Sequence, residues 1–303
     1  EQMLRPDFTV PVVQMHMAHG AAPARYTYAG EVFRRQEEDV RRPNEYMQAG
    51  FEIFGHDAPE SAEAEVFARI FDILRPLGLR AATGDIGLLI AAVEGLRTSA
   101  ARKVALRRHI WRPRRFRALI DRFSGRTPVP ETRAALLDAA DPMAGTGPLV
   151  GLRGPDEIAA RIAALRADAA TPPVSAEEVL LIDALLAVRE TAPNALEHLR
   201  DIAVDLPAIL PAVERLAKRL DALVARGIDI AALDFEASYG RTQMEYYDGF
   251  VFGFHAETRP DLPPVATGGR YDALTRQLGA GHEIPAVGGV IRPGLVLDLG
   301  GVT

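Results

Sequence analysis

The segment from Val32 to Gly55, VFRRQEEDVRRPNEYMQAGFEIFG, combines residue types that can bind an anion and a polar ligand. It predicts an apolar strand that ends in two arginines, then a charged loop and a second strand. Because side chains alternate between the two faces of a strand, Gln48, Gly50 and Glu52 share one face. The planar guanidinium of Arg34 offers a fork of donors that suits an oxyanion. The segment therefore predicts a binding site between two strands.

The elements that position this segment begin with strand, loop and strand between residues 26 and 55. A helix should follow, because Asp57-x-x-Glu60 resembles a capping box and Pro59 suits a first helical turn. Its apolar face is predicted to pack on the sheet, and Gly78 is placed to end it. That face comprises Val66, Ile70, Leu74 and Leu77.

Residues 86–232 are rich in Ala, Leu and Arg and show helical periodicity. Ser175-x-x-Glu178 predicts a second capping box. A further apolar face is predicted to end before Gly227, and it comprises Val213, Leu216, Leu220 and Leu223. This region is predicted to be a helical insertion.

Strand patterning returns after Leu233, with period-two alternation from Glu245 to His255. One predicted face carries Glu245, Tyr247, Gly249, Val251, Gly253 and His255, and the other carries Tyr246, Phe250, Phe252 and Phe254. We expect the aromatic face to be buried and the polar face to look into a site. Sheet segments at both ends of the chain, with helices between them, predict an α+β fold.

Composition narrows the classes of function. The chain has 303 residues, a formal net charge of −6 and a pI of about 5.7, which disfavours nucleic acid as a partner. It has no cysteine, which excludes disulfides and thiolate chemistry. No apolar run reaches the roughly 18 residues that span a bilayer, so we expect a cytoplasmic protein without a membrane partner. Because the chain opens at Glu1, we expect further N-terminal sequence to precede it.

Four segments together resemble the histidyl-tRNA synthetase-like branch of the class II aminoacyl-tRNA synthetase fold. In order they are LRPDFTVPVV, VFRRQ…MQAGFEIFG, MEYYDGFVF with ATGGRYDAL, and PAVGGVIRPGLVL. The resemblance covers residues 1–84 and 233–297, and it implies an antiparallel sheet flanked by helices. We accordingly expect residues 1–84 and 233–303 to form the class II core, and residues 85–232 to form a mainly helical insertion.

The resemblance also implies a pocket for histidine. In that family, the counterpart of Arg34 contacts the α-phosphate of ATP and the amino-acid carboxylate, and counterparts of Asp7 and Thr9 bind the α-amino group. Other counterparts line the pocket or lie near the imidazole. The candidate set is Asp7, Thr9, Arg34, Gln48, Glu52, Tyr247 and Tyr271. The alternative interpretation is that these polar side chains only satisfy one another inside the sheet.

Two departures from the family argue against catalysis. Thr242 stands where a synthetase has an arginine that helps to activate the amino acid, and Arg241 is one residue away, which on a strand places it on the opposite face. Leu295 stands where a motif 3 arginine clamps the γ-phosphate, although Arg292 is nearby. The chain ends a few residues later, so we expect no C-terminal anticodon-binding domain.

A synthetase-like core without these arginines resembles the family of ATP phosphoribosyltransferase regulatory subunits. That resemblance implies a noncatalytic subunit with no catalytic residue, cofactor or metal. It implies a self-dimer that joins the short-form catalytic subunit in a hetero-octamer. It further implies participation in the first step of histidine biosynthesis and in feedback inhibition by free histidine. The alternatives are a truncated histidyl-tRNA synthetase core and an amino-acid-activating enzyme that does not bind tRNA.

Three other features have competing interpretations. The basic run at residues 105–117 favours a solvated helical face with arginine stems over Trp111, rather than a nucleic-acid or partner surface. The spacing of His16 and His19 is compatible with a metal, but a surface or capping role is favoured because no further ligand is evident. Arg41 or Arg42 could hold a nucleotide, or could belong to an exposed charged hairpin, and the sequence leaves both open.

Overall fold

The computed structural model describes residues 3–35, 42–144, 146–148, 150–242 and 245–300. The strands are β1 (Ala24–Phe33), β2 (Glu45–Phe54), β3 (Arg80–Asp85), β4 (Arg189–Thr191), β5 (Asp234–Glu236), β6 (Phe250–His255), β7 (Ala266–Arg270) and β8 (Ala286–Ile291). The helices are α1 (Thr9–His19), α2 (Pro59–Leu74), α3 (Ile86–Gly95), α4 (Ala100–Arg108), α5 (Pro113–Phe123), α6 (Glu131–Asp138), α7 (Pro155–Ala170), α8 (Ala176–Ala187), α9 (Ala192–Asp205), α10 (Leu210–Val224), α11 (Asp272–Leu278) and α12 (Pro293–Asp298), with short 3₁₀ turns between some of them.

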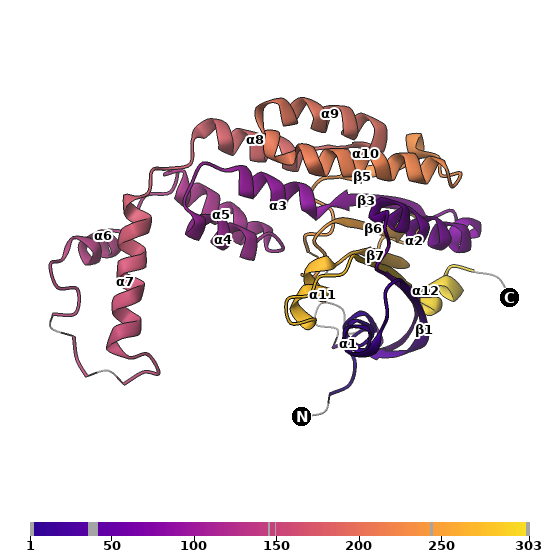
Figure 1. Cartoon of the computed structure of the whole chain (residues 1–303), viewed down its shortest axis with the longest axis horizontal. Coiled ribbons are helices and arrows are strands. Elements are labelled where there is room, and N and C mark those ends of the chain that lie inside the picture. Colours follow the sequence, from indigo (N-terminus) through magenta and orange to yellow (C-terminus); the bar gives the residue numbers. More distant parts are fainter. Residues whose placement is uncertain (1–2, 36–41, 145, 149, 243–244, 301–303) are drawn as a thin grey trace.

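The strands of the described residues form one sheet in the order β1-β2-β8-β7-β6-β3-β5-β4 (Figure 1). The pair β3 and β5 is parallel, and every other neighbouring pair is antiparallel. The predicted α+β class is confirmed, with the correction that the sheet is not purely antiparallel. Its central strands come from both ends of the chain, as the sequence predicts.

Helix α2 covers one face of the sheet, and α10 packs over α2. Phe67 of α2 lies 5.3–6.3 Å, between ring centroids, from Phe250, Phe252 and Phe254 of β6. The predicted aromatic face is therefore confirmed as buried for Phe250, Phe252 and Phe254, but not for Tyr246, which is half-buried and lies outside β6. The apolar faces predicted for α2 and α10 are also buried, except for the half-buried Leu77 beyond the end of α2.

Local signals at the helix ends are only partly confirmed. Helix α2 begins with Pro59 in its first turn, but the capping box predicted at Asp57 is wrong, because the cap residue is Ala58 and no side chain bonds to the helix end. The capping box of Ser175 and Glu178 is present in α8. Gly78 ends the helical segment with a φ of +59°, a value that glycine adopts without strain.

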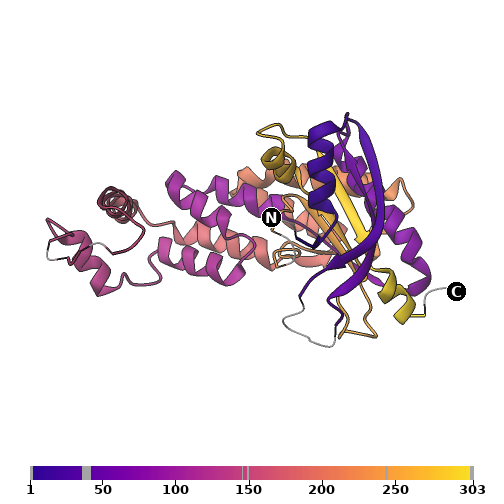
Figure 2. The same cartoon turned by 90° about the horizontal axis from the view of Figure 1, so that it is seen from below.

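Part of the predicted helical insertion packs with the sheet and its covering helix. Strand β4 and helix α10 both come from residues 85–232, and they pack within the sheet and on α2. Helices α6 and α7, which we call the arm, project away from the sheet in both cartoon views (Figures 1 and 2). The exact boundary between core and insertion stays a prediction. In the described part of the chain, we find no helix with the length and apolar character that crossing a membrane requires.

A buried ionic network joins α10 to the sheet. The two terminal nitrogens of Arg219 lie 2.8 Å from Glu63 of α2 and 2.8 Å from Asp85 at the end of β3. Arg270 at the end of β7 lies 2.9 Å from the other oxygen of Glu63. The side chains of Arg219, Glu63 and Asp85 are each 2–3% exposed. Because buried charges need partners, this network specifies where α10 sits on α2.

Replacing Arg219 by alanine should lower the free energy of unfolding by about 3–5 kcal/mol, because it leaves the buried Asp85 without its cation and Glu63 with Arg270 alone. Urea denaturation measures this loss. Arg200→Ala is the matched control, since Arg200 pairs with Glu197 on an exposed helix surface and should contribute about 1 kcal/mol or less. Equal effects of the two substitutions would contradict the role assigned to the buried network.

Candidate ligand-binding site

A polar cavity of about 190 Å³ lies on the face of the sheet opposite α2. Val290 lines this cavity, whereas its neighbour Gly289 lies against Ile70 of α2, which places the cavity on the other side of β8. The lining residues come from the start of α1, from strands β1, β2, β7 and β8, and from four connecting segments. They are Asp7, Thr9, Tyr28, Arg34, Gln48, Tyr246, Pro264, Thr267, Val290 and Arg292.

Four of the seven candidate residues line this cavity: Asp7, Thr9, Arg34 and Gln48. Asp7 and Arg34 form an ion pair of 3.5 Å between Oδ2 and Nη2, and Nε of Arg34 donates to the carbonyl of Pro6 at 2.7 Å. The side chain of Arg34 is 30% exposed, so it remains accessible from the cavity. A carboxylate and a guanidinium side by side can bind the ammonium and carboxylate of one amino acid.

Glu52 lies beneath this layer and is almost completely buried. The hydroxyls of Thr9 and Tyr28 donate to its Oε1 at 3.1 and 2.9 Å, and the hydroxyl of Tyr271 donates to its Oε2 at 2.6 Å. Burial raises the pKa of Glu52 to about 7, although the hydroxyl donors stabilise the charged form. The site therefore holds a carboxyl group that can exchange its proton near neutral pH.

The backbone beneath Glu52 must be glycine. A Cβ atom on Gly288 would lie 1.3 Å from Oε2 of Glu52, and Gly288 is directly opposite Glu52 in the antiparallel pairing of β2 and β8. One strand to the other side, Tyr28 pairs with Gly50, and a Cβ there would lie 2.8 Å from the tyrosine hydroxyl. These glycines leave room for polar side chains to lie flat over the sheet.

The two predicted tyrosines lie deeper than the cavity wall. Tyr271 is buried and bonds to Glu52, while Tyr247 is buried with its backbone carbonyl accepting from Nε1 of Trp111 at 3.2 Å. Tyr246, which the sequence placed on the aromatic face, lines the cavity instead. The prediction of a strand from Glu245 to His255 is wrong in its first half, because β6 begins at Phe250. Alternation of faces does not hold in the turn before it.

Sequence reasoning missed Tyr28, Tyr246 and Arg292 as lining residues. Tyr28 could have been found from the sequence. It shares one face of its strand with Tyr26 and Gly30, and the neighbouring strand carries Gln48 and Glu52 on that same face. Tyr246 had none, because its position depends on the turn. Arg292 precedes α12 and donates to the carbonyl of Pro264 at 2.8 Å, a contact between distant segments.

Arg241 and Thr242, at the first departure from the synthetase pattern, both lie outside the lining of the cavity. Arg241 is 5% exposed, its Nε donates to the carbonyl of Ile110 at 2.8 Å, and its guanidinium lies 5.1 Å from the ring of Phe116. Burial lowers its pKa to about 10. Thr242 is exposed beside the start of α5. Neither residue is among those that line the cavity.

A second cavity of about 450 Å³ adjoins the first and shares Arg34 and Arg292 with it. Leu295 contributes an apolar side chain to this second cavity, at the place where the sequence departs from motif 3. Arg42 also lines it and donates to the carbonyl of Asp261 at 2.8 Å. Arg41 lies outside the described residues, and nucleotide binding and an exposed charged hairpin both stay hypotheses for this loop.

His16 is not on the surface. It is 1% exposed, its Nδ1 lies 3.0 Å from the hydroxyl of Tyr26, and its ring stacks on Phe54 at 4.1 Å. The expected surface or capping role is therefore wrong for His16, whose ring belongs to the core. Across the residues that the structure describes, no group of three or more His, Cys, Asp or Glu side chains could hold a metal ion.

The basic run at residues 105–117 spans α4, the start of α5 and the turn between them. Arg107, Arg108 and Arg112 are exposed, as a solvated face predicts. Trp111, however, packs against the core and bonds to the backbone of Tyr247. Trp111 therefore connects the helical region to the backbone beside the site, and the interpretation that arginine stems cover its ring stays a hypothesis.

The sheet and its cavity define a class II synthetase-like protein of the histidyl branch. A family model described as histidyl-tRNA synthetase matches residues 2–149 and 158–293. Curated relatives from Brucella anthropi and Brucella canis, each named ATP phosphoribosyltransferase regulatory subunit, are 31% identical over 309 residues, which cover 94% of this chain and 80% of theirs. The chain therefore belongs to the family of ATP phosphoribosyltransferase regulatory subunits.

Solved structures support the fold. An ATP phosphoribosyltransferase regulatory subunit/histidyl-tRNA synthetase from Bacillus halodurans superposes with a TM-score of 0.63 at 21% identity, covering 97% of this chain and 64% of that one. A histidyl-tRNA synthetase from Nostoc sp. PCC 7120 gives 0.62 at 15% identity, covering 100% of this chain and 63% of that one. The chain thus spans less than two thirds of both solved chains. The class II synthetase-like fold predicted from the four segments is confirmed.

The raised pKa of Glu52 predicts a pH dependence of stability. The folded protein keeps a proton on Glu52 up to about pH 7, whereas the unfolded chain loses it near 4.5. This contribution is complete below pH 4.5 and is lost as the pH rises through 7. Between pH 5 and pH 8, wild type should therefore lose about 2–3 kcal/mol of stability that Glu52→Gln does not lose.

Urea denaturation at both pH values measures the difference. Glu214→Gln, which changes an exposed carboxylate on α10, should show the same pH dependence as wild type. If Glu52→Gln and wild type lose stability in parallel, the carboxyl group is already ionised at pH 5.

Proposed function

We propose that this chain is a noncatalytic regulatory subunit of an ATP phosphoribosyltransferase complex, a glycosyltransferase assembly that performs the first step of histidine biosynthesis. Its partners are a second copy of itself and the short-form catalytic subunit, in a cytoplasmic hetero-octamer. The observation that carries the proposal is a cavity that keeps groups for amino-acid recognition, Asp7, Arg34 and Gln48, beside a second cavity where Leu295 replaces a phosphate-binding cation.

Free histidine is the proposed ligand of the first cavity. Asp7 and Thr9 supply oxygens for the ammonium group, and Arg34 with Gln48 supplies donors for the carboxylate. Glu52, whose pKa is about 7, lies beneath these groups and outside the cavity lining, so it supports Thr9 rather than contacting the imidazole. Tyr28 and Tyr271 hold the Glu52 carboxyl group in place. The seven candidate residues thus divide into a layer that contacts the ligand and a layer that supports it. The first comprises Asp7, Thr9, Arg34 and Gln48, and the second comprises Glu52, Tyr247 and Tyr271.

Adenylation of histidine is not part of the proposal. A donor that stabilises the transferring phosphate is worth about 10²–10³ in rate. Arg241 is held by the carbonyl of Ile110 and the ring of Phe116, and Leu295 carries no charge. Both donors that a synthetase would use are therefore missing from the cavities, which leaves binding without reaction.

Feedback inhibition would follow from linkage. Histidine shifts the complex toward a less active assembly only if it binds that assembly more tightly than the active one. The route for such coupling is the hydrogen bond from Trp111 of the helical region to the backbone carbonyl of Tyr247, whose neighbour Tyr246 lines the cavity.

Mixing the purified chain with a short-form catalytic subunit should stimulate phosphoribosyl transfer from phosphoribosyl pyrophosphate to ATP, and histidine should reduce that stimulation. Absence of both complex formation and stimulation would falsify the proposed function. The main alternative, a histidyl-tRNA synthetase core, is suggested by the matching family model. It requires histidine-dependent ATP–pyrophosphate exchange by the chain alone, for which we expect no signal above background.

Histidine binding has its own test by isothermal titration calorimetry. Asp7→Asn removes the charge that faces the ammonium group, and should weaken binding about tenfold or more, as expected for a charge-assisted hydrogen bond. Asp57→Asn is the matched control, because Asp57 is exposed and lies outside the cavity. If Asp7→Asn binds histidine as tightly as wild type does, the histidine site lies elsewhere on the protein.

A further inference from the structure

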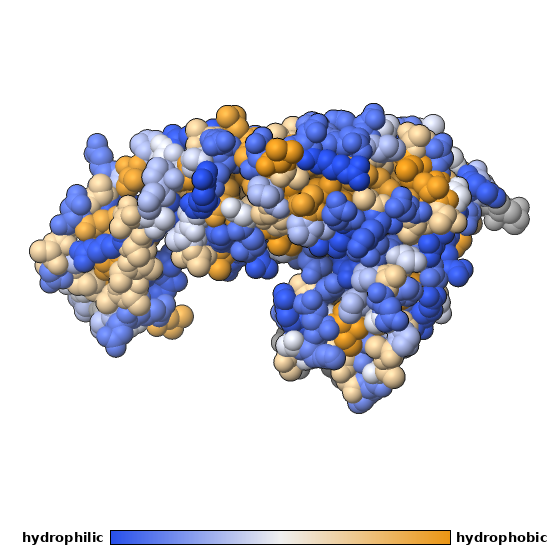
Figure 3. All heavy atoms as spheres, turned by 45° about the horizontal axis from the view of Figure 1, so that its top comes forward, coloured by the Kyte–Doolittle hydropathy of each residue, from blue (hydrophilic) through white to orange (hydrophobic). Residues whose placement is uncertain are grey.

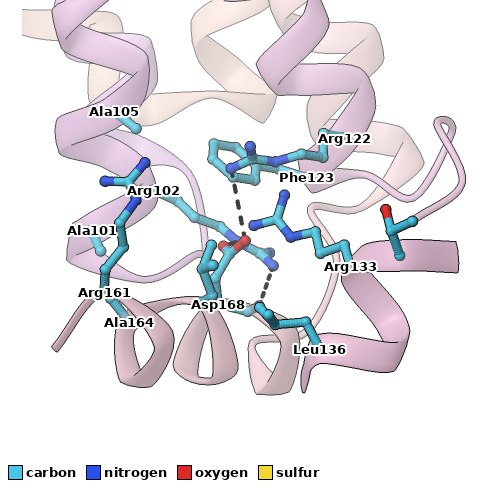
Figure 4. Close-up of a pocket in the computed structure, with 12 residues that line it drawn as sticks. Ala101, Arg102, Ala105, Arg122, Phe123, Arg133, Leu136, Arg161, Ala164 and Asp168 are labelled. Carbon is cyan, nitrogen blue, oxygen red and sulfur yellow. Dashed lines mark hydrogen bonds and ion pairs between the residues drawn. The ribbon is translucent and has the colours of Figure 1, made fainter. Parts of the chain in front are cut away.

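A separate cavity of about 710 Å³ lies between the arm and the helices beside it (Figure 4). It is lined by α4 and α5 on one side and by the arm helices α6 and α7 on the other. Its apolar surface comes from Ala101, Ala105, Phe123, Leu136, Ala164 and Leu165. The volume falls in the range of about 300–1,000 Å³ that small-molecule sites occupy.

The charged groups of this cavity are unbalanced. Four arginines line it, one on each of the four helices: Arg102, Arg122, Arg133 and Arg161. Asp168 of α7 is the one carboxylate among the lining residues. Four positive charges against one negative charge leave an excess of three, although the whole chain carries a net charge of −6.

Asp168 is already engaged. Its Oδ1 accepts from Nε of Arg102 at 2.7 Å, and its Oδ2 lies 3.7 Å from Arg122. Arg102 also donates to the backbone carbonyls of Asp168, Thr171 and Pro172 at 2.7–3.2 Å. Arg102 and Asp168 therefore form a structural joint between α4 and α7, and the remaining arginines must find counter-charge elsewhere.

The side chains of Arg133 and Arg161 make no hydrogen bond or ion pair with any residue in the part of the chain that the structure describes. Figure 4 shows the guanidinium of Arg133 directed toward Arg122 and Asp168 across the cavity. Burial, and then repulsion from Arg133 and Arg102, lowers the pKa of Arg122 despite the attraction of Asp168. The guanidinium groups thus repel one another across a hollow that an anion could fill.

We propose that this cavity binds a small molecule through a phosphate or diphosphate group held by Arg122, Arg133 and Arg161. Arginine forks match the oxygens of a phosphate in a bidentate manner, and three excess charges match a polyanion. The apolar surface would accept the uncharged remainder of the ligand. This site is separate from the proposed histidine cavity, with which it shares no lining residue.

Binding there would restrain the arm. Helices α6 and α7 have no buried residue, so little apolar packing holds them in place. The space-filling view shows the molecule hollowed between the arm and the core (Figure 3). A phosphate that contacts Arg122 of α5 together with Arg133 and Arg161 of the arm would add charge-assisted bonds across that weakly packed junction.

Isothermal titration calorimetry at low ionic strength, with pyrophosphate, inorganic phosphate and citrate as probes, tests the proposal on the whole chain. We expect wild type to bind pyrophosphate, and Arg133→Gln with Arg161→Gln to weaken it about tenfold or more. The control Arg75→Gln with Arg108→Gln removes the same charge from exposed positions, and should change the dissociation constant by less than about twofold.

Arg34→Gln with Arg292→Gln should retain this binding, which separates the site from the cavities on the sheet. The proposal is overturned if wild type does not bind pyrophosphate, if both arginine pairs weaken it equally, or if citrate binds as tightly. It is also overturned if only Arg34→Gln with Arg292→Gln abolishes binding. Circular dichroism verifies that each variant is folded, and Arg133 and Arg161 can be replaced safely because neither supports another side chain.

Discussion

Arg219 is the contact on which the arrangement of this molecule depends. It arises from α10, about 130 residues or more after the two carboxylates it bridges, and it joins α2 to the end of β3. A buried pair of this kind adds little net stability over a well-packed apolar cluster, but its loss is costly. The Arg219 network therefore fixes where α10 lies, because Arg219 can pair with both Glu63 and Asp85 only when α10 has one position against the sheet.

The buried ionic network of Arg219 also connects to the candidate site. Glu63 also binds Arg270, whose side chain bonds to Asp272, and between them Tyr271 is directed into the sheet. Tyr271 in turn donates to Glu52, and Glu52 accepts from Thr9 and Tyr28 at the cavity. A chain of charge-assisted and hydroxyl contacts thus connects the packing of α10 to the orientation of groups at the ligand-binding surface.

Sequence reasoning succeeds here where local physics decides the outcome. The strand pair from 26 to 55, the apolar faces of α2 and α10, and the shared face of Gln48 and Glu52 follow from periodicity alone. It fails where contacts between distant segments decide. The turn before β6 brings Tyr246 rather than Tyr247 to the cavity, and β4 joins the sheet from a helical region through its pairing with β5. Neither outcome is encoded within a few neighbouring residues.

The position of Arg241 bears on whether the cavity supports a reaction or only binds a ligand. A one-residue difference on a regular strand would reverse its side chain, yet Arg241 lies in a turn where that rule does not apply. What holds it away is a specific bond to Ile110 and a contact with Phe116 from the helical region. Returning it to the cavity would break both contacts and expose Phe116. Its distance from the site is therefore maintained by packing, and a cavity so arranged favours recognition of a ligand over its conversion.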